Sequence, residues 1–152
     1  MPRFAFKFQS ILDLKLQIEE SLKNELGKSV QKLEQEKEKL STIEAERDNQ
    51  IENFNEKSSK GMLVEKLRDH NAYISYLKER IERQKENVNL AQNIVDKNRE
   101  KLIKAMQERE MLDKLKEKKY KEYLKEQLKL ENKANDEIVS FKYAEKPGDE
   151  NG

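Results

Sequence analysis

The chain has no cysteine, no tryptophan and a single histidine, His70, among its 152 residues. Without cysteine it forms neither disulfides nor thiolate sites, and one histidine cannot supply a histidine-rich metal site. We therefore expect no bound metal and no other cofactor.

Proline and glycine are also scarce, with two and four residues. Pro2 and Pro147 lie near the ends, so residues 3–146 lack the residue that most strongly interrupts a helix. The longest apolar run, Met62 to Val64, is far shorter than the roughly 20 residues that cross a bilayer, and the N-terminus lacks the apolar core of a signal peptide. These features predict a mostly helical cytoplasmic protein with no direct membrane insertion.

Charged residues make up 41% of the chain and hydrophobic residues 34%, which is too little to fill a large globular core. The 32 basic and 31 acidic residues are interspersed, so no acidic polymer is indicated as a partner. Lysines gather between Lys114 and Lys121, but Asp113, Glu117 and Glu122 interrupt them. A nucleic-acid binder is thus the weakest reading, and it predicts strongly salt-dependent association.

Apolar residues recur in heptads on both sides of one interruption, which includes Ser58, Ser59 and Gly61. The pattern predicts an all-α antiparallel coiled-coil hairpin over residues 1–141. Helix one spans about 4–56, the turn about 57–61 and helix two about 62–139, and residues 142–152 form a disordered tail. With the turn centred at Ser58 and Ser59, Phe54 faces Leu63, and apolar pairs follow at Ile43 with Ile74, Leu40 with Leu77, Leu26 with Ala91 and Leu22 with Val95.

No arrangement typical of an enzyme is found. The chain lacks a glycine-rich phosphate loop and a nucleophile in a recognisable setting, and its carboxylates are typical of a solvated helix surface. His70 falls on the apolar seam, where a two-helix hairpin offers no pocket for catalysis. We expect a protein that is not an enzyme and acts by binding other proteins.

Two regions carry apolar residues beyond what packing one hairpin requires. Phe4, Phe6 and Phe8 alternate at the N-terminus and are followed by Ile11 and Leu12. Packing against helix two near Arg109 and Leu112 would account for Phe8, but it accounts less well for Phe4 and Phe6. Helix two also extends past helix one from about Lys114, which predicts an uncovered apolar stripe that suggests a partner. The stripe includes Leu115, Tyr120, Tyr123, Leu124, Leu128 and Leu130.

A third cluster lies just past the turn, from Tyr73 to Gln84. Ile74, Leu77 and Ile81 suit the seam, so we expect Tyr73, Tyr76 and Arg80 to face outward.

Three segments give the chain a recognisable likeness. They are the opening FKFQSILDLK, the pattern Tyr-Ile-x-x-Leu-x-x-x-Ile-x-x-Gln from Tyr73 to Gln84, and the closing DEIVSFKY. In order and position they resemble the FliJ family of flagellar type III export proteins.

This resemblance implies a cytoplasmic stalk, similar to the γ shaft of rotary ATPases, that is peripherally associated with the membrane-embedded export apparatus. Its paired helix ends would enter the hexameric ring of the export ATPase FliI, favour the assembled ring and raise its activity. The ring contacts would be Phe4, Phe6, Phe8, Ile11, Leu12, Tyr120, Tyr123 and Leu124.

By the same resemblance, the surface early in helix two would contact the export gate FlhA, and the protein would handle export chaperones. The gate contacts would be Tyr73, Leu77, Arg80 and Gln84, with Arg80 where the family pattern leads us to expect a small residue. A homo-oligomeric structural coiled coil that acts as a spacer is the alternative from another class.

Overall fold

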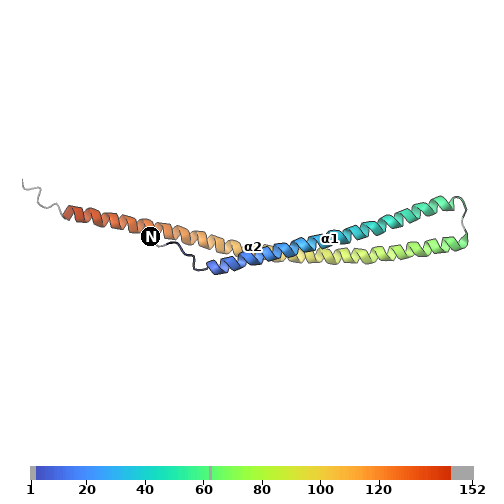
Figure 1. The fold of residues 1–152 in the computed structure, drawn as a ribbon, viewed down its shortest axis with the longest axis horizontal. Coiled ribbons are helices and arrows are strands. Elements are labelled where there is room, and N and C mark those ends of the chain that lie inside the picture. Colours follow the sequence, from blue (N-terminus) through green and yellow to red (C-terminus); the bar gives the residue numbers. More distant parts are fainter. Residues whose placement is uncertain (1–2, 62, 145–152) are drawn as a thin grey trace, which may run out of the picture. The chain divides into compact units, whose positions relative to one another are not determined.

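The computed structural model describes residues 3–61 and 63–144, which contain two helices and no strand. Helix α1 spans Gln9–Ser58 and helix α2 spans Val64–Ala144 (Figure 1). The helices pack against each other, which confirms the predicted all-α hairpin. Within these two ranges, neither helix has a stretch apolar and long enough to cross a membrane.

The chain divides into two compact units, and both helices contribute to each. The hairpin unit is Ile18–Ala105, and the terminal unit joins the chain up to Gln17 with the chain from Met106 onward.

The core of the hairpin unit consists of two apolar clusters that join the predicted seams. One is built on Ile43, Leu77 and Ile81, and the other on Leu33, Ala91 and Val95. Leu40 and Ile74 pack against the first cluster and Leu26 against the second. Burying a Leu or Ile side chain stabilises a fold by about 1.5–3 kcal/mol, so these few residues hold the two arms of the hairpin together.

The hairpin turn lies further along the chain than predicted. Ser58 and Ser59 donate hydroxyl hydrogen bonds to the carbonyls of Asn55 and Glu56, at 3.2 and 2.7 Å; Ser58 is the last residue of α1 and Ser59 follows directly after it. Gly61 has a φ of +85°, a backbone conformation that side chains with a Cβ rarely adopt, and it reverses the chain.

The later turn changes the pairing close to it. Phe54 stacks on His70 with ring centroids 4.0 Å apart, instead of facing Leu63, which is exposed. The prediction that Phe54 faces Leu63 was therefore wrong by about two helical turns of α2, because the two serines were read as the turn itself.

Both helices also differ from the predicted ranges at the ends of the chain. Helix α1 begins at Gln9 and not near Phe4, and α2 continues to Ala144, beyond the predicted end near Val139. Residues 142–144 of the expected tail are therefore helical, and residues 145–152 lie outside the described residues.

Candidate functional site

The N-terminal aromatic residues lie before α1, in an extended segment at residues 3–6 and a turn at Lys7 and Phe8 that is closed by a hydrogen bond of 3.1 Å from the Gln9 amide to the Phe6 carbonyl. Phe4, Phe6 and Phe8 are buried or half-buried, whereas Arg3, Ala5 and Lys7 between them are exposed. An alternation of this kind is typical of extended backbone, since successive side chains point to opposite sides. A helix would spread the three rings around its surface, which explains why α1 begins only after them.

Phe4 joins the extended segment to α2 in the terminal unit. Its ring lies 5.2 Å from that of Tyr120 in an edge-on arrangement and 5.5 Å from that of Tyr123. Phe6 contacts Phe8 in a second edge-on pair at 5.9 Å. Aromatic pairs of this geometry contribute about 0.5–1.5 kcal/mol each beyond the area that they bury, so the segment is held in place by its own rings.

The predicted ring contacts are therefore only partly free. Phe6 and Leu12 are buried, Phe4, Phe8 and Tyr123 are half-buried, and Ile11, Tyr120 and Leu124 are exposed. An ion pair of 2.8 Å between Lys15 and Glu108 adds a polar link between α1 and α2 in the same unit.

The expectation that nothing in the N-terminal part of the chain covers Tyr120 and Tyr123 was wrong. An extended chain advances about 3.3 Å per residue against 1.5 Å in a helix, so the segment before Gln9 reaches further along α2 than a helix of the same length. Between the segment and α2 lies a groove of about 540 Å³, whose lining includes Phe4, Phe8, Lys119 and Tyr123.

Beyond Tyr123 the apolar stripe of α2 is exposed. Leu124 retains 47% and Leu128 58% of their surface. Every described residue from Leu128 to Ala144 is exposed, among them Leu130, Ile138, Val139 and Phe141. Together with the aromatic groove, this stripe is the largest run of uncovered apolar side chains on α2 in the terminal unit.

Two of the four predicted gate contacts are buried between the helices. Leu77 is 0% exposed and belongs to the core of the hairpin unit, and Gln84 is 8% exposed. Tyr73, which was expected to face outward, is half-buried and donates a hydroxyl hydrogen bond across the hairpin to Glu46. This bond to a carboxylate, with some burial, raises the pKa of Tyr73.

Gln84 is held by Glu36, a buried carboxylate on α1. The Gln84 amide donates to the backbone oxygen of Glu36 at 2.9 Å and to its carboxylate at 2.5 Å. The Glu36 carboxylate also pairs with Lys32 at 2.9 Å and lies 3.7 Å from Lys39. Hydrogen bonds from Lys32 and then Gln84 lower the pKa of Glu36, because they stabilise its charged form.

Tyr76 and Arg80 are the outward members of this region, as predicted. Both are exposed, and the Arg80 guanidinium lies 5.8 Å from the centre of the Tyr76 ring. A cation over an aromatic ring is a favourable contact, so the pair forms an ordered feature on the outer face of α2.

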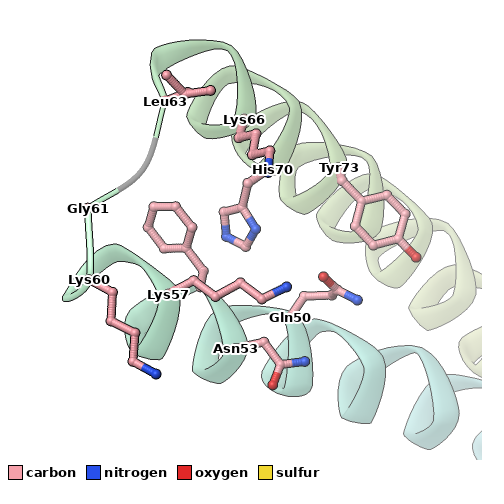
Figure 2. A pocket seen from close by; sticks show the side chains of 10 residues that line it. Gln50, Asn53, Lys57, Lys60, Gly61, Leu63, Lys66, His70 and Tyr73 are labelled. Atoms are coloured by element: carbon pink, nitrogen blue, oxygen red, sulfur yellow. The ribbon is translucent and has the colours of Figure 1, made fainter.

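Near the hairpin turn lies a cleft of about 630 Å³ that the sequence did not predict (Figure 2). Its lining includes Phe54, Lys57, Leu63, Lys66 and His70. Figure 2 shows Lys57 lying between the two helices and His70 projecting toward α1 from α2, with Lys66 beside it. The sequence feature that could have indicated this cleft is the pair Phe54 and His70, which lie on opposite seams near the turn.

The family model described as "Flagellar FliJ protein" matches residues 4–148. Among the curated proteins none matches. Among solved structures, a putative YscO homolog, CT670 from Chlamydia trachomatis, is similar with a TM-score of 0.68 and 26% identity, over 93% of this chain and 96% of that one.

Proposed function

Because this chain belongs to the flagellar FliJ protein family, we propose that this component of a type III export apparatus is the non-enzymatic stalk of the export ATPase. In this role the terminal unit docks into the hexameric ring of the export ATPase FliI and favours its assembled state. The protein works in the cytoplasm at the membrane-embedded export apparatus.

The observation that carries this proposal is the exposed apolar stripe of α2 beside the aromatic groove. Leu124 and Leu128 lie one helical turn apart and are both about half exposed, and Tyr123, which lines the groove, directly precedes Leu124 in the chain. Exposed apolar surface of this extent is costly in water and is typical of a protein interface. The family match and the resemblance to a YscO homolog support the type III setting.

The stalk contributes no catalytic group in this mechanism. Among residues 3–61 and 63–144 no cluster of three potential metal ligands is found. A ligand that binds the assembled ring more tightly than its separate subunits shifts the equilibrium toward the ring. ATP turnover then rises because more of the ATPase is assembled.

The test is the ATP hydrolysis rate of the cognate export ATPase during titration with this protein. We expect stimulation that saturates, and loss of most of it in the variant Leu124→Ser with Leu128→Ser. The matched control is Ile94→Ser with Ile103→Ser, which removes two exposed apolar residues from the hairpin unit. An ATPase rate that stays constant over the whole titration contradicts the proposal, and equal loss in both variants moves the contact away from the stripe.

We also propose that the outer face of α2 in the hairpin unit links the stalk to the export gate FlhA. Tyr76 and Arg80 are available for direct contact, with Tyr73 at the edge, whereas Leu77 and Gln84 act from within the core and position this face. Tyr76→Ala with Arg80→Ala is expected to weaken co-purification with the gate and to leave the thermal melting of the protein unchanged.

Leu77→Ala separates these two roles. Removing a fully buried Leu costs about 2–5 kcal/mol of stability, so this variant is expected to lower the melting temperature as well as gate binding. This assignment would be contradicted by two results together. In one, gate binding survives Tyr76→Ala with Arg80→Ala; in the other, Leu77→Ala loses gate binding although its melting temperature is unchanged, which would place Leu77 in the contact.

Export chaperones complete the proposed set of partners, and no residue is assigned to them. A second candidate function is the homo-oligomeric spacer, since the exposed stripe of α2 also fits a second copy of the chain. The mass of the protein in solution separates the two candidate functions.

A further inference from the structure

Three lysines, Lys57, Lys60 and Lys66, line the cleft at the hairpin turn. Lys32, Lys37, Lys39 and Lys85 each lie within 4 Å of a carboxylate three or four residues away. In the part of the chain that the structure describes, Lys57, Lys60 and Lys66 have no carboxylate oxygen within that distance. No acidic residue lines the cleft. Glu52, Glu56, Glu65 and Asp69 flank the turn in the chain but do not line the cleft, so the lining of the cleft itself is positive.

The cleft also offers apolar surface next to these charges. Phe54 and His70 stack with an interplanar angle of 10°, and together they bridge α1 and α2. Leu63, which lines the same cleft, is 71% exposed and packs little against its own chain. A ligand that fits this surface therefore carries negative charge together with at least one apolar side chain.

From this arrangement we propose that the cleft at the hairpin turn is a docking site for an acidic segment of a partner protein. Its carboxylates pair with Lys57 and Lys66, with Lys60 at the rim, and an apolar side chain packs on Leu63 and the Phe54–His70 stack. This site is independent of the ring contact proposed above, because all of its residues belong to the hairpin unit.

A protein segment fits this site better than a small anion does. The lysines come from both sides of the turn, at the end of α1 and the start of α2, and the cleft of about 630 Å³ is larger than a phosphate ion needs. An extended acidic peptide reaches the separate charges and also covers Leu63, whereas a small anion uses only the charges.

His70 provides a direct probe, because it is the single histidine of the chain and lies within the cleft. We would titrate the whole protein with a synthetic peptide of repeated Glu-Asp-Leu and follow the imidazole proton signals of His70 by NMR. A saturable shift is expected that weakens as salt is raised. The same peptide with Gln and Asn in place of the acids should leave the signals unmoved.

The cleft variant is Lys57→Gln with Lys66→Gln, and the matched control is Lys97→Gln with Lys101→Gln on the exposed surface of the same unit. The cleft variant loses two exposed ion pairs with the peptide, so it should bind the peptide roughly two- to thirtyfold more weakly. The control should bind as the unchanged protein does.

Three results would overturn the proposal. One is the absence of a saturable His70 shift at millimolar peptide, and another is an equal loss of affinity in the cleft and control variants. The third is an equally strong response to inorganic phosphate, which would make the cleft a small-anion site and not a docking site for a protein segment.

Discussion

Glu36 and Gln84 show how one buried polar contact specifies the pairing of two long helices. The carboxylate and amide lie between the cluster of Leu77 and the cluster of Ala91. In the described residues, each buried side-chain nitrogen or oxygen atom has a hydrogen-bond partner. A shift of α2 by one turn would separate Gln84 from Glu36 and leave both without that partner, which is costly in a nonpolar setting. Polar residues at seam positions are known to fix register in this way at some loss of stability.

The lowered pKa of Glu36 gives a prediction about acid stability. Because the folded state holds the charged carboxylate through Lys32 and Gln84, the contribution is complete above the ordinary glutamate pKa of about 4.3 and is lost as the pH falls through the lower folded value. Thermal melts followed by circular dichroism from pH 7 to pH 3 should therefore show a smaller loss of stability for Glu36→Gln than for the unchanged protein.

Glu34→Gln is the control for this measurement, because Glu34 is exposed. Its ion pair with Lys37, at 3.8 Å, lies on the surface. Its melting temperature should fall with pH as that of the unchanged protein does. Identical acid profiles for all three proteins would show that Glu36 contributes nothing specific.

At the scale of the helices, the sequence predicts the type of element well and its ends less well. The heptad seams identify Ile43, Leu77 and Val95 as core residues because burial requires one apolar face, and the structure confirms this. The seam does not determine where a helix stops, because Lys, Glu and Ser are compatible with both a helix and a loop. Hence Ser58 and Ser59 were interpreted as the centre of the turn, although Ser58 still belongs to α1 and Ser59 follows directly after it.

The N-terminal segment shows the second kind of difference. A chain without proline between its ends was expected to be helical from Phe4. Instead Phe4 packs on Tyr120 and Tyr123, and this contact outweighs the helix preference of its neighbours. Contacts between residues more than a hundred positions apart, such as Phe4 with Tyr120, cannot be read from local pattern alone. The cleft at Phe54 and His70 was missed because the turn was placed too early in the chain, which paired Phe54 with Leu63 instead of His70.

At the scale of the whole molecule, the two candidate functions differ in what covers the exposed stripe of α2. A spacer built from several copies pairs the stripe with itself, whereas a stalk keeps it free for another protein. The stripe is flanked by lysines and glutamates of mixed sign, and α2 carries no continuous heptad of apolar residues after Tyr123. Stable coiled-coil pairing needs apolar residues at both seam positions over several heptads.

We therefore expect the isolated protein to be a monomer. Static light scattering should give a mass near 18.1 kDa at micromolar concentration, and the mass should be the same for Leu124→Ser with Leu128→Ser, since no partner copy is lost. A mass of twice this value that falls to that of one chain in the variant would instead assign the stripe to a second copy. In that case the stimulation of the ATPase should be absent as well, because the surface proposed to enter the ring would already be covered.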